Sequence, residues 1–235
     1  MYVFMGFAYF KYEVMRMDTQ ALFQITYGLF VVSSAYGNER SGCVVNTLTQ
    51  VTNTPDRLSV AVSKENYTAG LIEKSGVFAA VVLNEDADFN LIGRFGFKSG
   101  REIPKYEGID FQNDANGVPY QTEAVSARFS CRVTQKVDVG THFIFIGVLE
   151  EAEKMSDIRP MTYEYYRTVI KGGTPKNAPS YQMKEKTIHK ENVKMKKKFR
   201  CLICGYEIEV EGDSLPEDFV CPICGVGPDQ FEEVE

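Results

Sequence analysis

The hydrophobic pattern between Tyr27 and about Glu153 is mainly that of β-strands. Several stretches rich in Val, Ile, Phe and Ser, with turn residues between them, predict strands: GLFVVSSA, RLSVAVS, GVFAAVVL, SARFSCRVTQKV and HFIFIGVLEEA. The stretch NYTAGLIEKSG predicts a short helix that begins at Asn66 and ends near Gly76, and MDTQALFQI predicts another. Many strands with few helices predict a mainly β fold, a closed antiparallel barrel with helical additions.

The character of the chain changes after residue 171. GGTPKNAPSYQ is rich in Gly, Pro and Asn, and the Lys-rich MKEKTIHKENVKMKKK follows it, so residues 172–198 are predicted to be a flexible linker. The remaining tail, 199–235, is strongly acidic, and this charge reversal indicates a domain boundary. We therefore expect a barrel domain at 17–171 and a small domain at 199–235. Residues 1–16 are treated as an extension without an assigned role.

Charge and cysteine usage narrow the class of protein. The formal net charge of −6 gives no support to nucleic-acid binding. The uncharged N-terminal run stops at Phe10, short of a membrane span, and no signal peptide is recognisable. Cys43 and Cys131 are isolated in apolar strands and are predicted to be core residues. Together these features predict a cytoplasmic protein with reduced thiols.

Four cysteines in the tail have metal-ligand spacing. CLICG and CPICG place two thiolates on each of two tight turns, an arrangement that suits Zn²⁺ or a single iron; the ligands are Cys201, Cys204, Cys221 and Cys224. Spacing alone leaves the metal open. The surrounding CLICGYEIE, LPEDFVCPICG and GPDQFEEV resemble rubredoxins, which implies one iron. The tail departs from free-standing rubredoxins in its shorter middle segment and in Phe219, which stands where those proteins carry tryptophan.

An iron that takes one electron at a time needs a loader, and a flavin can accept a hydride and release single electrons. The segment 41–76 offers candidates for a flavin site. Lys64, Asn66 and Thr68 surround a predicted helix N-terminus, which attracts phosphate. Asn46, Thr47 and Gln50 could face a polar ring edge. The alternative is that Asn66 merely caps the helix and that Thr47 merely decorates a strand.

The barrel segment resembles the flavin reductase-like family of FMN-binding split barrels. The resemblance rests on GLFVVSSAYGNERSGCVVNTLTQVTNTPDRLSVAVSKENYT, RFGFKSGRE and GTHFIFIGVLEEAE. It implies a homodimer that binds FMN near the subunit interface, with cofactor contacts at Val45, Asn46, Thr47, Gln50, Ser63, Lys64, Asn66 and Thr68. It also implies that His142 lies near the flavin ring, where the nicotinamide of NAD(P)H docks, unless it is an ordinary strand-end histidine. RFGFKSGREIPKY, residues 94–106, is expected to be either a loop that meets NAD(P)H phosphates or a basic surface turn.

Chains that join these two modules resemble the high-molecular-weight rubredoxins. That resemblance implies a relay in which NAD(P)H reduces FMN, FMN reduces the rubredoxin iron, and the iron supplies a partner such as a flavodiiron protein that reduces nitric oxide or oxygen. One alternative is a flavin reductase that releases free reduced FMN and uses zinc to hold its tail. The other is a non-enzymatic scaffold with a zinc ribbon and an empty barrel.

Overall fold

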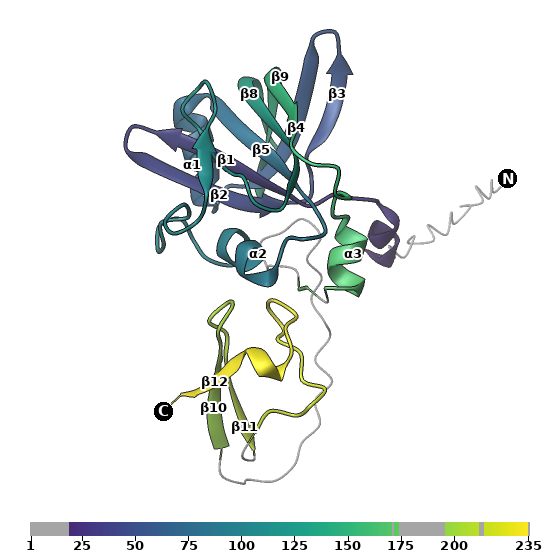
Figure 1. Cartoon of the computed structure of the whole chain (residues 1–235), viewed down its shortest axis with the longest axis vertical. Coiled ribbons are helices and arrows are strands. Elements are labelled where there is room, and N and C mark those ends of the chain that lie inside the picture. The colour runs from purple at the N-terminus through teal and green to yellow at the C-terminus, as the bar shows by residue number, and fades with distance from the viewer. Residues whose placement is uncertain (1–18, 171, 174–195, 212–213, 235) are drawn as a thin grey trace, which may run out of the picture.

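One antiparallel sheet forms the framework of the N-terminal part of the chain. The computed structural model describes residues 19–170, 172–173, 196–211 and 214–234 (Figure 1). The sheet has seven strands in the order β2-β1-β5-β8-β9-β4-β3. Their bounds are β1 (Phe30–Tyr36), β2 (Glu39–Val45), β3 (Thr49–Asn53), β4 (Asp56–Ser63), β5 (Val77–Leu83), β8 (Val125–Asp138) and β9 (His142–Lys154). The mainly β prediction is confirmed.

Alternation along these strands produces two apolar faces, because successive side chains of a strand point to opposite sides. One face gathers a buried cluster from six strands: Val32, Cys43, Leu58, Val60, Val62, Phe78, Ala80, Cys131 and Phe145. The neighbouring residues Val31, Ala79 and Val81 belong to a second cluster on the other face. Cys43 and Cys131 are thus core residues, as predicted, and burial raises their thiol pKa values to about 11 and about 12.

The sheet curls so that β2 approaches β4, although no backbone ladder joins them among the described strands. The contact is made by Thr47, just after β2. Its Oγ1 donates to the carbonyl of Ala61 at 2.9 Å and accepts from the Ala61 N–H at 3.2 Å. Strand β3 pairs with β4 only from Asp56 to Ser59, so this hydroxyl satisfies β4 where the ladder has ended.

Helices cover both faces of the sheet. Helix α1 (Tyr67–Ser75) begins after the N-cap Asn66 and ends at Gly76, whose φ of 71° requires the left-handed region, as the sequence predicts. Its residues Ala69 and Ile72 belong to the first of the two clusters, the one that contains Val32 and Phe145. The second cluster, on the other face, includes residues of α2 (Phe89–Gly96), of α3 (Tyr163–Thr168) and of the hairpin formed by β6 (Phe111–Asn113) and β7 (Pro119–Gln121). The predicted first helix is the short 3-10 helix η1 (Thr19–Gln24).

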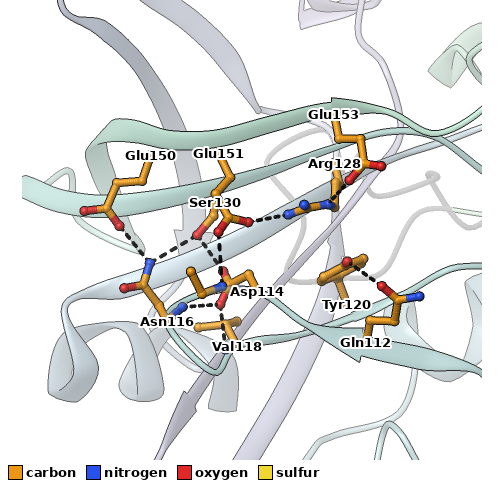
Figure 2. Close-up of polar contacts among 11 residues, drawn as sticks. Gln112, Asp114, Asn116, Val118, Tyr120, Arg128, Ser130, Glu150, Glu151 and Glu153 are labelled. Atoms are coloured by element: carbon orange, nitrogen blue, oxygen red, sulfur yellow. Dashed lines mark hydrogen bonds and ion pairs between the residues drawn. The ribbon is translucent and has the colours of Figure 1, made fainter.

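A polar cluster fixes the turn between β6 and β7 to the β8–β9 pair (Figure 2). Asp114 is buried and accepts from Ser130 Oγ at 2.5 Å and from the Val118 N–H at 2.8 Å. Arg128 forms ion pairs with Glu151 at 2.5 Å and Glu153 at 2.7 Å. These hydrogen bonds and ion pairs join members of the cluster to one another, which indicates a structural role.

The tail is a separate three-stranded sheet in the order β11-β10-β12. Its elements are β10 (Lys196–Cys201), β11 (Glu207–Glu211), the 3-10 helix η2 (Pro228–Gln230) and β12 (Phe231–Val234). Strand β10 begins inside the predicted linker. The rest of that linker from residue 174, and the extension 1–16, lie outside the described residues. Within the described ranges, no helix is long and apolar enough to cross a membrane.

Candidate functional site

The two cysteine turns of the tail repeat one hydrogen-bonding pattern. In the first turn, the Gly205 N–H donates to the Cys201 carbonyl at 2.9 Å, and in the second the Gly225 N–H donates to the Cys221 carbonyl at 2.8 Å. Gly205 and Gly225 have φ values of 73° and 78°, so each turn closes through a left-handed residue that glycine adopts readily. The predicted reason for glycine after each CxxC is therefore confirmed.

The four sulfur atoms converge on one point. They lie within 4.8 Å of one another, with the Cys201–Cys224 and Cys204–Cys221 Sγ pairs each 3.5 Å apart. Tetrahedral metal–sulfur bonds of about 2.3 Å give sulfur–sulfur edges of about 3.8 Å, so the cage fits Fe or Zn²⁺. Cys201, Cys221 and Cys224 are buried, and only Cys204 is partly exposed. Over the described residues, no other group of His, Cys, Asp or Glu has metal-binding geometry.

The four cysteines interact with one another and with nearby backbone N–H groups. The pKa of Cys221 is lowered to about 2, first by its hydrogen bond with Cys204, then by Cys224 and by backbone N–H groups of Cys224 and Ile223. The pKa values of Cys204 and Cys224 are raised, mainly by hydrogen bonds with Cys221 and Cys204 respectively, while backbone N–H groups of Tyr206 and Val226 act in the opposite direction. Such amide–sulfur bonds orient thiolate ligands and stabilise their charge. Phe219 packs edge-on against Phe231, with ring centroids 5.3 Å apart.

The predicted flavin residues lie on neighbouring elements of the barrel. Thr47 bonds to β4 through Ala61, and β4 leads through Ser63 and Lys64 into the N-terminus of α1. Ser63 is directly opposite His142 in the β4–β9 register. The structure therefore gathers the ends of β2 and β4, the start of β9 and the start of α1 into one region. The predicted residues there are Val45, Asn46, Thr47, Ser63, Lys64, Asn66, Thr68 and His142.

Several of these side chains already have protein partners. Asn66 Oδ1 accepts from the Thr68 N–H at 3.0 Å, so the capping role is present. Thr68 is fully buried and its hydroxyl donates to Ser41 Oγ at 3.2 Å. Lys64 Nζ pairs with Asp138 at 2.6 Å. Direct side-chain contact of Thr68 with a phosphate would require its bond to Ser41 to break.

Gln50 and His142 also make local bonds. Gln50 Nε2 donates to Asp56 Oδ1 at 3.0 Å across the β3–β4 hairpin, which is exposed. His142 Nδ1 bonds to the Thr141 hydroxyl at 2.8 Å, which fixes the orientation of the half-buried ring. Lys64 Nζ lies 4.8 Å from the ring centroid of Phe143, the residue after His142, in a cation–π contact.

The segment 94–106, expected to be either a loop that meets NAD(P)H phosphates or a basic surface turn, is partly helical and partly buried. Its first residues belong to α2, and Lys105 is buried, with Nζ donating to the carbonyls of Arg94 and Lys98. Burial is the main cause that lowers the Lys105 pKa from 10.5 to about 8. Arg101 lies 5.0 Å above the Tyr67 ring and donates to the Glu65 carbonyl. Lys105 thus caps the C-terminal end of α2, and its buried ammonium group does not face a ligand from solvent. This capping role cannot be recognised from a run of basic residues in the sequence.

A cavity of about 310 Å³ lies where the loop after α2 meets the start of α1. Asn66 and Tyr67 line one side of this cavity, and residues 95–100 line another. Ile223, from the second cysteine turn of the tail, also lines it. The metal centre and the predicted phosphate segment are therefore neighbours in the folded chain, which no pattern in the sequence indicated.

Comparison with known proteins identifies a family for each of the two parts of the chain. A family model described as flavin reductase like domain matches residues 22–174, and one described as rubrerythrin, rubredoxin-like domain matches residues 199–232. A high molecular weight rubredoxin of Moorella thermoacetica is 39% identical over 93% of this chain and 100% of that protein. A ferric-chelate reductase (NAD(P)H) of Archaeoglobus fulgidus is 36% identical over 70% of this chain and 98% of that protein.

Solved structures show the same barrel fold. An NADH:FAD oxidoreductase of Streptomyces globisporus superposes with a TM-score of 0.56 at 20% identity, covering 60% of this chain and 84% of that one. An FMN-binding protein of Thermus thermophilus gives 0.53 at 20% identity, covering 68% of this chain and 85% of that one.

A flavin reductase-like barrel joined to a four-cysteine, rubredoxin-like tail defines an electron-transfer oxidoreductase, with one module suited to flavin and the other to iron. The chain belongs to the flavin reductase-like family and, within it, to the high molecular weight rubredoxins.

Proposed function

We propose that this protein takes hydride from NAD(P)H into barrel-bound FMN and passes single electrons through the iron of its own tail to a redox partner. The observation that carries this proposal is that Ile223, next to the metal ligand Cys224, lines the same cavity as Asn66 at the predicted phosphate segment. The similarity to the ferric-chelate reductase (NAD(P)H) of Archaeoglobus fulgidus supports NAD(P)H as the electron donor.

The chain's own residues would hold the FMN at the junction of β2, β4 and α1. Val45, Asn46 and Thr47 would face the ring, and Gln50 is a further ring contact from the hairpin. The phosphate would lie by Ser63, Lys64, Asn66 and Thr68, where the N-terminal end of α1 and the Lys64 ammonium supply positive charge. FMN, when bound, accepts a hydride and releases electrons singly.

His142 would position the nicotinamide beside the ring. Its orientation is fixed by Thr141, and its backbone lies opposite Ser63, so the imidazole belongs to the same region as the phosphate segment. Replacing it with alanine should slow hydride transfer more than it weakens FMN binding.

The partner, the assembly and the location are also part of this proposal. A flavodiiron protein is the proposed acceptor, and the acidic tail suits docking on a basic surface. A homodimer would complete the flavin site, and six cysteines without a disulfide among them suit a reducing cytoplasm.

The decisive experiment is an anaerobic visible spectrum of the FMN-supplied protein, before and after an excess of NADH or NADPH, together with metal analysis. We expect one iron per chain and bleaching of both flavin and ferric tetrathiolate bands. Zinc in the tail with bleaching of flavin alone would replace this proposal with a flavin reductase that releases its product. No flavin binding and no pyridine-nucleotide oxidation would favour the scaffold.

A further inference from the structure

Each cysteine turn of the tail rests on a glycine of the preceding part of the chain. The first turn meets Gly93 of α2, where an added Cβ would lie 2.7 Å from Ile203 Cγ2. The second turn meets Gly173, where a Cβ would lie 2.7 Å from both the Ile223 oxygen and the Cys224 carbonyl carbon. At Gly173 the atoms met are backbone, so no side chain fits there unless the tail moves away. At Gly93 the atom met belongs to the Ile203 side chain, so a small residue needs only that side chain to shift, whereas a large one pushes against the tail.

Hydrogen bonds hold the second contact in place. The Gly173 N–H donates to the Cys224 carbonyl at 2.7 Å. The Tyr166 hydroxyl of α3 donates to the Gly173 carbonyl at 2.9 Å, and Gly172 passes so close that a Cβ there would lie 2.0 Å from the Tyr166 ring. Gly172 and Gly173 therefore connect α3 to a metal ligand, although they stand within the predicted flexible linker.

Apolar side chains surround the first contact. Ile203 is 7% exposed and belongs to the tail cluster with Cys201, Cys221 and Cys224, against which Phe89 and Phe97 at the two ends of α2 also pack. In Figure 1 the tail accordingly lies beside α2 and α3. The contact brings a metal ligand's immediate neighbour, Ile203, directly onto the backbone of α2.

We infer that Gly93 and Gly173 form a two-point socket for the cysteine turns, and that the tail iron is loaded while it occupies this socket. This inference rests on the proposed function for the loading step, but not for the docking itself. In each loading event one electron of the hydride pair passes to iron, and Fe(III) becomes Fe(II). The external acceptor takes that electron before the second one passes.

The docking half can be tested without flavin or NADH, on protein carrying zinc in the tail. Gly93→Leu and Gly173→Ala are expected to shift the radius of gyration in small-angle X-ray scattering to larger values. Gly96→Ala is the matched control, because its Cβ would meet Val44 at an ordinary 3.6 Å in the same helix. Adding Ile203→Ala to Gly93→Leu should return the compact profile, since it removes the clashing Cγ2. Unchanged scattering of both socket variants would overturn the socket.

The loading half is tested by stopped-flow mixing of the FMN- and iron-containing protein with NADH. The socket variants should bleach flavin at the wild-type rate but reduce iron about tenfold more slowly or worse, because transfer then depends on the tether alone. Gly96→Ala should match wild type, and Ile203→Ala should restore iron reduction in Gly93→Leu. Open variants that reduce iron at the wild-type rate would show that loading does not use the socket. Failure to bleach flavin even in wild type would instead refute the proposed function and leave the scattering result standing.

Discussion

At the scale of single residues, Lys105 shows how a charged side chain can serve the fold. Its ammonium group donates to the carbonyls of Arg94 and Lys98 at the C-terminal end of α2, where a cation complements the helix dipole. The cost is burial, which lowers its pKa to about 8. The side chain therefore joins the loop 97–105 to the end of α2 through two hydrogen bonds, and its ammonium group loses a proton at a lower pH than an exposed lysine does.

This gives a prediction for pH. The unfolded chain keeps the Lys105 proton up to about pH 10.5, whereas the folded protein releases it near pH 8, so the folded state binds fewer protons between these values. The contribution of Lys105 to the free energy of unfolding should therefore rise with pH, by about 2 kcal/mol between pH 7 and 9.5. Urea unfolding of wild type and of Lys105→Met at both pH values measures it as a difference.

Subtracting the pH dependence of Lys105→Met from that of wild type removes the contributions of other groups that titrate between pH 7 and 9.5. If the two proteins change in parallel from pH 7 to 9.5, the lysine keeps its ordinary pKa despite its burial. Lys105→Arg is a useful companion, because arginine stays charged and should show no rise.

At the scale of elements, the question at helix α1 is whether Asn66 caps the helix or binds the phosphate of FMN. Asn66 demonstrably caps, and aspartate can accept the same bond from the Thr68 N–H. We expect Asn66→Ala to lower the free energy of unfolding by about 1 kcal/mol, whereas Asn66→Asp should leave it nearly unchanged. If phosphate binds at this N-terminus, the added carboxylate should weaken FMN binding about tenfold or more by charge repulsion.

Fluorescence titration with FMN and with riboflavin separates the two roles. The aspartate variant should lose affinity for FMN but not for riboflavin, which lacks the phosphate. Equal affinity of wild type and Asn66→Asp for FMN would leave Asn66 as a cap and place the phosphate elsewhere.

Elements differ in how well the sequence revealed them. Strands β1, β4, β5, β8 and β9 were predictable from their apolar, β-branched stretches between turn residues, and α1 was predictable from Asn66 and Gly76 at its ends. Helix α2 was not, because FNLIGRFG carries two glycines that lower helix propensity. One of them, Gly93, is explained only by the tail that packs on it, a contact between distant parts of the chain.

At the scale of the whole molecule, the two parts should differ in their dependence on metal. The tail has a small core in which the cysteines themselves are central, whereas the barrel has two extensive clusters of its own. Removal of the metal should unfold the tail and leave the barrel folded. Circular dichroism and limited proteolysis before and after chelation under reducing conditions test this.

The same difference governs substitution of a ligand. Cys221→Ser should abolish the tetrathiolate and make the tail sensitive to protease, with little change in thermal unfolding of the barrel. Loss of the barrel transition in this variant would mean that docking of the tail contributes substantially to barrel stability.

The sequence predicted the two-part organisation and the metal ligands from local patterns, because two CxxCG turns fix their own geometry. The flavin region was only partly accessible in this way. Gln50, Lys64, Asn66 and Thr68 were chosen for their polarity, yet each has a partner within the protein. Which polar groups remain for a ligand depends on the folded neighbours.

The two hydrogen bonds between Thr47 and Ala61 have a consequence for the residues that relatives of this protein can carry at position 47. Among the described strands, β2 forms no ladder on the side facing β4, so the hydroxyl of Thr47 is what joins this end of β2 to β4, at Ala61. Ser, which keeps the hydroxyl, should be accepted at position 47 among distant relatives, and Val, its near-isostere, should be rare.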